Sequence, residues 1–216
     1  MNRKPPITFQ EYERIFRVLH SISRRLDNRL GVSCPFYNTA GAHLLESCLG
    51  ISARPRMGSA FVRVDDATDT VMAFGVVSEN GLECDSNEHA FHCWIETSEH
   101  IVDFTAPVYS SYMERWPKEA QIDIPRKMFI KSKTNMALSH TDLRTEGDFY
   151  MQPNLALAQQ LLQNALKSSA VGDLIVACQQ WFVKPPKKMP TSLTLMNDLG
   201  AIIDVQLTKT RIIGAW

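Results

Sequence analysis

The spacing of apolar residues changes near Ala53, and this change limits the folds that the chain can adopt. Residues 9–26 and 34–50 place apolar side chains three or four positions apart, which predicts two amphipathic helices. After Ala53, segments 59–65, 71–78 and 89–96 are rich in Val, Phe and Ile and are separated by turns that contain Asp, Asn and Gly. Helices followed by a run of strands predict an α+β fold rather than regular βαβ alternation.

The boundaries of these elements follow from local signals. The first helix is expected to end near Asp27-Asn28, and Gly50 is a good stop for the second helix. A short strand over 101–104 would complete a hairpin with 89–96. Residues 106–139 contain three prolines and no steady period, so they are expected to form loops with short elements that could line a substrate cleft.

The second half of the chain adds further elements. Apolar spacing predicts helices over 155–166 and 174–181, the latter after Gly172-Asp173, then a turn-rich connector over 184–190 and a strand over 201–213. A chain of 216 residues suits one domain. We therefore expect a single domain over 1–216, with a core at about 28–108 and a C-terminal elaboration at 109–216.

Charge and composition narrow the function classes. Lys plus Arg and Asp plus Glu both number 23, so no global field favours nucleic acid or anionic membranes as partners. No signal-peptide pattern and no apolar run of about 18 residues occurs, so a cytoplasmic location is expected. Five scattered cysteines without a CxxC pair predict free thiols and neither a structural metal nor another cofactor.

Cys34 is the candidate nucleophile. Pro35 suits the first turn of a helix, so Cys34 would lie at the helix start, where unpaired N–H groups and the positive end of the dipole stabilise a thiolate. A single cysteine is more often a small buried apolar residue. Cys48 and Cys178 lie within apolar patterns, so both are predicted to be buried core thiols.

The segment 92–103 supports the catalytic interpretation. A tight turn at Ser98-Glu99 would pair Trp94 with Asp103 and place His92 diagonally beside Asp103 on one face. The alternate face would then be apolar, since it carries Cys93, Ile95, Val102 and Phe104. His89 would fall on that apolar face because strand side chains alternate with a period of two, so His92 is the predicted base.

These residues resemble a known superfamily. Gly31-Val-Ser-Cys34, the following alanine-containing helix and the exit Leu49-Gly-Ile-Ser-Ala-Arg54 resemble the nucleophile helix of transglutaminase-like proteins. His92-Cys-Trp94 resembles the His-x-Trp strand of that family, and Val102-Asp-Phe-Thr105 resembles its Val-Asp-x-Thr segment. The region 92–107 also resembles a bacterial group of uncharacterised papain-like proteins.

The resemblance implies a papain-like fold in which a nucleophile helix packs on an antiparallel sheet. It also implies a catalytic triad of Cys34, His92 and Asp103 that forms a thioester from a peptide or amide substrate. The product would be an acid or a transferred acyl group. The position of the papain-like oxyanion glutamine is taken here by Asn28, a shorter side chain.

The same residues bear on three alternative interpretations. No acidic cluster suggests the calcium sites of animal transglutaminases. Arylamine acetyltransferases have Arg-Gly-Gly before the cysteine, whereas this chain has Arg29-Leu-Gly-Val-Ser33, so acetyl-coenzyme A chemistry ranks lower. The alternative from another class is an inactive papain-like fold that binds a peptide or partner without turnover.

Overall fold

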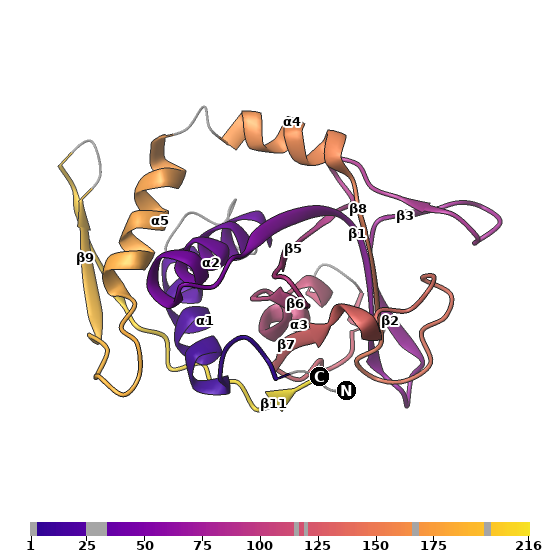
Figure 1. Cartoon of the computed structure of the whole chain (residues 1–216), viewed down its shortest axis with the longest axis horizontal. Coiled ribbons are helices and arrows are strands. Elements are labelled where there is room, and N and C mark those ends of the chain that lie inside the picture. The colour runs from indigo at the N-terminus through magenta and orange to yellow at the C-terminus, as the bar shows by residue number, and fades with distance from the viewer. Residues whose placement is uncertain (1–3, 25–33, 115–116, 119–120, 166–168, 197–199) are drawn as a thin grey trace.

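The chain adopts an α+β fold in which helices and a mixed sheet form a common core (Figure 1). This computed structural model describes residues 4–24, 34–114, 117–118, 121–165, 169–196 and 200–216. The helices and the sheet confirm the predicted α+β class. Among the described residues, no helix has the length and apolar character needed to cross a membrane.

Two helices precede the strands, as expected. Helix α1 (Phe9–Ser23) begins with a capping box between Thr8 and Glu11 and ends at Ser23, before the predicted boundary at Asp27-Asn28. Residues 25–33 lie outside the described part of the chain. The Arg24 N–H closes the helix by donating to the carbonyls of His20 and Ile22.

Helix α2 (Cys34–Leu49) begins at the candidate nucleophile and ends where predicted. Gly50 has a φ of +68°, a left-handed conformation that glycine adopts without a steric cost. Its N–H donates to Glu46, and the Ile51 N–H donates to Leu45 over 2.9 Å, so the last helical carbonyls are satisfied. The glycine thus turns the chain directly from α2 toward the sheet.

The main sheet has seven strands in the order β11-β7-β6-β5-β1-β2, with β8 also paired to β1. All these pairs are antiparallel except β11 with β7. The strands are β1 (Arg54–Asp65), β2 (Thr70–Phe74), β5 (His92–Glu96), β6 (His100–Asp103), β7 (Lys127–Ser132), β8 (Phe149–Pro153) and β11 (Gly214–Ala215). Strands from both sides of residue 108 therefore belong to one sheet.

The hairpin that carries His92 and Asp103 has the predicted register. Ile95 pairs with Val102 and Glu96 pairs with Ile101, as a turn at Ser98-Glu99 requires. The turn is closed by the Thr97 N–H, which donates to the His100 carbonyl over 2.9 Å. Because strand side chains alternate, this register sets which residues share a face.

Segment 106–139 consists of loops with short elements, as predicted, although the sequence did not indicate where its strand lies. The short elements are η1 (Ala106–Val108), α3 (Tyr109–Met113), β7 and η3 (Lys133–Asn135). Pairing with β6 stabilises β7, and such long-range pairing has no local signal. Strand β8 was also missed.

The C-terminal elements differ from expectation in their boundaries. Helix α4 (Leu155–Ala165) follows Pro153 as predicted, whereas α5 (Ser169–Trp181) begins before Gly172 and includes it. The predicted strand over 201–213 is only β10 (Ile202–Gln206), which forms a separate hairpin with β9 (Ser192–Met196). A further small hairpin joins β3 (Val76–Val77) to β4 (Cys84–Asp85).

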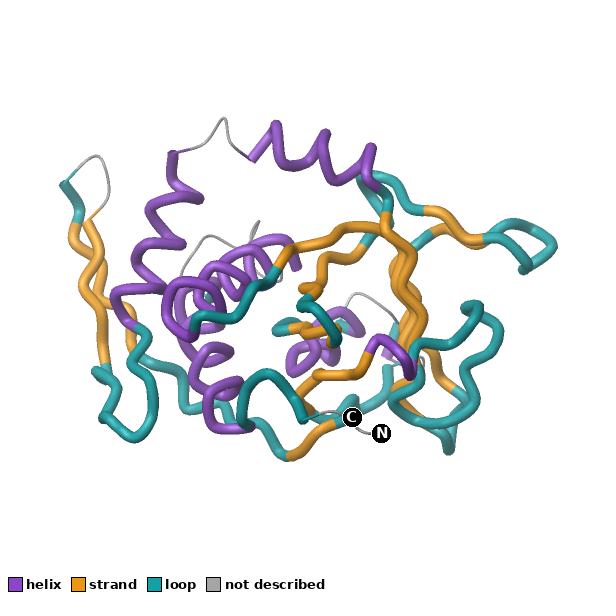
Figure 2. Tube along the Cα trace, in the orientation of Figure 1, coloured by secondary structure: helices purple, strands orange, loops and turns teal. Residues whose placement is uncertain are grey.

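The two faces of the hairpin pack against different clusters. Ile95, Val102 and Phe104 pack in a core with α1, α2 and α5, which lie together on one side of the strands (Figure 2). Trp94 and Ile101 belong to a second buried cluster that includes strands β1, β2, β7 and β8. Both faces are therefore covered, and the face with His92 and Asp103 is also interior.

Gly41 sets the distance between α2 and the hairpin. A Cβ at this position would overlap the ring of Phe104 and approach the Ile95 Cδ1 to 3.3 Å. We expect Gly41→Val to lower the free energy of unfolding by about 1–3 kcal/mol through overpacking. Urea denaturation measures the change. Gly172→Val, with open space around that position, is the control for helix propensity and is expected to be well tolerated.

Candidate active site

Cys34 is the first residue of α2, with a side chain that is almost fully buried. Its exposed fraction is 6%, and it packs with Met57 of β1 and Cys93 of β5. The first N–H groups of a helix have no carbonyl partner within the helix and lie at the positive end of its dipole. Cys34 therefore occupies the predicted place, while Asn28, the candidate oxyanion residue, lies outside the described residues.

His92 and Asp103 are in direct contact. The His92 Nε2 lies 2.8 Å from the Asp103 Oδ2, and both side chains are fully buried. Their strands are neighbours in the sheet, so the hairpin alone accounts for this juxtaposition. His89 lies elsewhere, since its side chain is 87% exposed and is 3.5 Å from Glu88.

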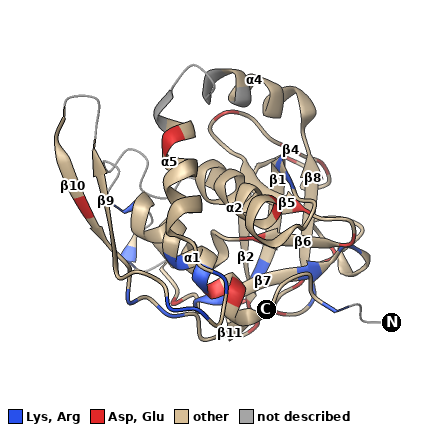
Figure 3. Ribbon diagram, turned by 60° about the vertical axis from the view of Figure 1, so that its left-hand side comes forward, with Lys and Arg blue, Asp and Glu red and all other residues tan. Residues whose placement is uncertain are grey.

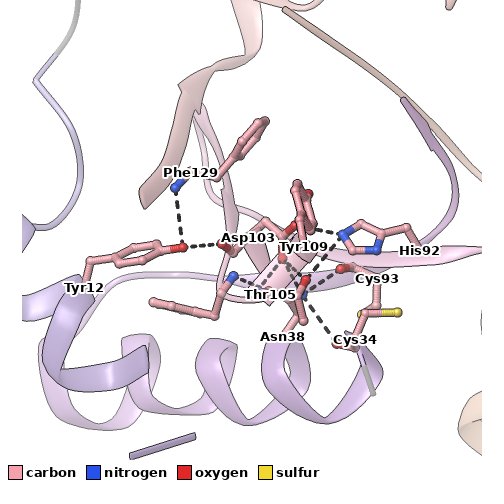
Figure 4. A network of polar contacts seen from close by, with 10 residues as sticks. Tyr12, Cys34, Asn38, His92, Cys93, Asp103, Thr105, Tyr109 and Phe129 are labelled. Carbon is pink, nitrogen blue, oxygen red and sulfur yellow. Dashed lines mark hydrogen bonds and ion pairs between the residues drawn. The ribbon is translucent and has the colours of Figure 1, made fainter. Parts of the chain in front are cut away.

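Donors surround both oxygens of the Asp103 carboxylate (Figure 4). Oδ2 accepts from the Tyr109 hydroxyl over 2.6 Å as well as contacting His92. Oδ1 accepts from the Thr105 N–H over 2.8 Å, from the Thr105 hydroxyl and from the Asn38 Nδ2 over 2.9 Å. Burial opposes ionisation, but the charge of His92 and these hydrogen bonds lower the pKa of Asp103. The group is therefore a carboxylate at neutral pH.

Asn38 links helix α2 to the hairpin through several hydrogen bonds. Its Nδ2 donates to the Cys93 carbonyl over 2.6 Å as well as to Asp103, and its Oδ1 accepts from the Phe104 N–H over 3.0 Å. Asn38 lies one helical turn after Cys34, on the same side of α2. One side chain thus holds α2 in register with both strands.

The two ring nitrogens of His92 differ in their contacts. Nε2 contacts Asp103, whereas the buried Nδ1 makes no hydrogen bond to any residue that the structure describes. The ring also stacks on Phe74, with centroids 4.4 Å apart, so its orientation is restrained by packing. A buried polar atom without a partner is rare in folded proteins, because it loses its hydrogen bonds to water without replacement.

The electrostatics of the site favour the imidazolium form. Burial alone would lower the pKa of His92, but the negative charges of Asp103 and Cys34 outweigh it and raise the pKa to about 10. Cys34 lies at the start of α2, which packs beside the strand β5 that carries His92 (Figure 4).

The other cysteines lie in different environments. Burial raises the pKa of Cys93 well above its usual value, and the charges of Cys34 and Asp103 add to this effect. Cys178 is a core thiol as predicted, and burial raises its pKa to about 12. Cys48 is only partly buried, although it packs on the same core, and Cys84 is also partly exposed. No group of metal-ligating side chains is present in the described ranges.

Sequence reasoning missed four residues of this network. Asn38 carried a usable signal, because it follows Cys34 by one helical turn, and Thr105 follows Asp103 by two positions. No signal in the sequence indicated Tyr109 or Tyr12 as part of the site. The Tyr12 hydroxyl donates to the Asp103 carbonyl across a separation of 91 residues, which only tertiary packing brings together.

Fold and site together define an α+β protein with a buried cysteine, histidine and aspartate where a helix start meets an antiparallel hairpin. Residues 8–216 match the model of a family described as "Protein of unknown function (DUF2026)", and the chain belongs to that family. A search of the curated proteins finds no match.

A solved structure shares this fold. The structure titled "The crystal structure of genomics APC5867" is similar to the chain with a TM-score of 0.83 and 29% sequence identity. The match covers 99% of this chain and 98% of that one. The whole architecture, including the elements after residue 108, is therefore shared with a related protein.

Proposed function

We propose that this chain is a cysteine-dependent amide or peptide hydrolase, or an acyltransferase, with a papain-like fold and a transglutaminase-like core. The observation that carries the proposal is the buried Nδ1 of His92, which has no hydrogen-bond partner within the described part of the chain. The ring is held by Asp103 through Nε2, it is buried, and it is electrostatically coupled to Cys34 at the start of α2. This arrangement suits a nucleophile and base oriented by a third group.

The proposed chemistry assigns one role to each residue. Nδ1 of His92 holds the proton of Cys34, and the thiolate attacks the carbonyl carbon of an amide or ester. The amine or alcohol leaves with that proton, and a thioester remains on Cys34. Water or a second amine then cleaves the thioester, giving an acid or a new amide. Asp103 keeps the imidazole oriented and stabilises its positive charge.

The Cys34 N–H at the helix start is the proposed oxyanion donor. The same N–H groups that favour the thiolate would also favour negative charge on the carbonyl oxygen as the tetrahedral intermediate forms. The contribution of Asn28 remains a prediction.

A second candidate is an inactive papain-like fold that binds a peptide or partner. The observation that favours it is burial, because His92 and Asp103 are fully covered and Cys34 is 6% exposed. Substrate would need a path to a thiol that packs against Met57 and Cys93. Thiol reactivity separates the two candidates without knowledge of the substrate.

Iodoacetamide at pH 6 is expected to label Cys34 before the more exposed Cys48 and Cys84, because only Cys34 has an imidazolium beside it. His92→Ala is expected to slow the labelling of Cys34 by at least about tenfold. Peptide mass mapping over a pH series measures each rate. Cys178, with a fully buried side chain, becomes labelled only if the protein unfolds and so reports on folding in each variant.

A labelling rate at Cys34 no faster than at Cys48 or Cys84 would contradict the enzyme proposal. A Cys34 rate that is unchanged in His92→Ala would do the same. Either result would favour the binding module.

A further inference from the structure

A cavity of about 350 Å³ lies between the start of β1, the end of β8 and helix α4. Its walls are largely apolar and include Pro55, Met57, Pro153, Leu155 and Ala158. Leu155 is 70% exposed, so an apolar side chain lies at the open rim rather than in the core. The volume is at the lower end of the range for small-molecule sites.

Two residues that line the cavity also pack in or against the buried cluster of Cys34. Met57 is 4% exposed and belongs to the buried cluster of Cys34 and Cys93, and Ala158 of α4 packs against the same cluster. Both residues also line the cavity. Methionine is unbranched and flexible, so Met57 is a wall residue that can adapt its shape to a ligand. The cavity is thus the apolar space next to the nucleophile.

The charge around the cavity is low. Helix α4 contains no Asp, Glu, Lys or Arg, and its ribbon carries neither blue nor red in Figure 3. Among the described lining residues, the charged one is Arg56. Its Nε lies 3.2 Å from Glu96, a carboxylate that also lies 3.5 Å from Lys133. The remaining polar groups are the side-chain amides of Gln159 and Gln163. A charged ligand would lose its hydration here without gaining a dedicated partner.

We propose that this cavity binds the acyl side of the substrate, and that the acyl group is small, apolar and uncharged, such as a benzoyl-like or short aliphatic group. The inference rests on the proposed function, since it takes Cys34 as the residue that carries the acyl group as a thioester. The leaving amine or alcohol would lie on the other side of Cys34, away from α4.

The test compares thiol probes that differ only in the group they carry. Cys34 is treated with iodoacetamide, N-benzyl-iodoacetamide and iodoacetate, and the rate at Cys34 is measured by peptide mass mapping. We expect N-benzyl-iodoacetamide to react about tenfold faster than iodoacetamide, the factor that about 1.4 kcal/mol of apolar burial gives. Iodoacetate is expected to be the slowest of the three probes.

Two substitutions test whether the faster reaction of the benzyl probe depends on the cavity. Leu155→Asp puts a charge at the exposed rim, and Ala158→Trp fills the space, so each is expected to reduce the benzyl-to-unsubstituted rate ratio to near one. Val176→Asp, on α5 and 48% exposed, is the matched control and should keep the wild-type ratio. Leu155 is exposed, so its variant tests the inference even if Ala158→Trp fails to fold.

The failures of the two proposals are distinguishable. Fast labelling of Cys34 by iodoacetamide with a ratio near one in the wild type would overturn the cavity inference and leave the enzyme proposal intact. A high ratio that survives in Leu155→Asp would also overturn it. Slow labelling of Cys34 by all three probes would overturn both proposals.

Discussion

Asp103→Ala is expected to lower the free energy of unfolding by about 3–5 kcal/mol, the cost of breaking a buried ion pair by removing one partner. The carboxylate accepts from His92, Tyr109, Thr105 and Asn38, and all four groups would lose an acceptor in the protein interior. The measurement is urea denaturation at pH 7.

The same substitution should change the ionisation of His92. Burial lowers the pKa of this imidazole. Two charges counteract that effect, and Asp103 makes the larger contribution of the two. Without Asp103, the pKa of His92 is therefore expected to fall, and the NMR titration of the ring carbons follows it. Asp103→Asn offers a milder variant for this measurement if the alanine variant is too unstable.

Asp173→Ala is the control for the unfolding measurement, because Asp173 is exposed on α5. Its effect should stay within about 0.5 kcal/mol. A loss of less than about 1 kcal/mol for Asp103→Ala would mean that the carboxylate contributes no more than an exposed ion pair, contrary to the network described here.

The stability that His92 contributes is expected to depend on pH in a defined window. The pKa of His92 is raised from 6.5 to about 10 in the folded protein, so folding favours the protonated ring. The contribution of the protonated ring to stability is full below pH 6.5. It declines as the pH rises from 6.5 toward 10 and is lost above about pH 10. The pKa of Asp103 is lowered, so its own contribution is lost only as the pH falls into the acidic range.

The measurement is the difference in unfolding free energy between the wild type and His92→Gln from pH 6 to pH 10. NMR titration of His92 provides a direct check, with a midpoint expected near pH 10. Cys34→Ser removes one of the two negative charges near the ring. It should therefore lower the titration midpoint of His92 and narrow the pH range over which the stability contribution of His92 declines.

Cys48→Ser is the matched control, since Cys48 lies at the other end of α2. The titration of His92 should be unchanged in this variant. A midpoint near 6.5 in the wild type would show that the ring feels neither Asp103 nor Cys34. A midpoint that Cys34→Ser leaves unmoved would separate Cys34 from the other two residues and count against the triad.

Local patterns in the sequence were sufficient for the parts of the site that lie within one element or one hairpin. Pro35 after Cys34 predicted the helix start, and the spacing between His92 and Asp103 predicted both the register and the shared face. These features depend on periods of 3.6 and 2 residues and on a tight turn, which act over short separations along the chain.

Only the tertiary structure decided which distant groups complete the site. Strand β7 forms because β6 pairs with it, and the Tyr12 hydroxyl reaches the Asp103 carbonyl because α1 packs beside the hairpin. The cavity beside Met57 likewise requires α4 to pack on β1. The sequence by itself determined the α+β class, the start of α2 and the contact between His92 and Asp103. The closure of the site depended on the docking of α1, α2 and α4, since hydrophobic packing between distant segments is non-directional and leaves no fixed spacing in the sequence.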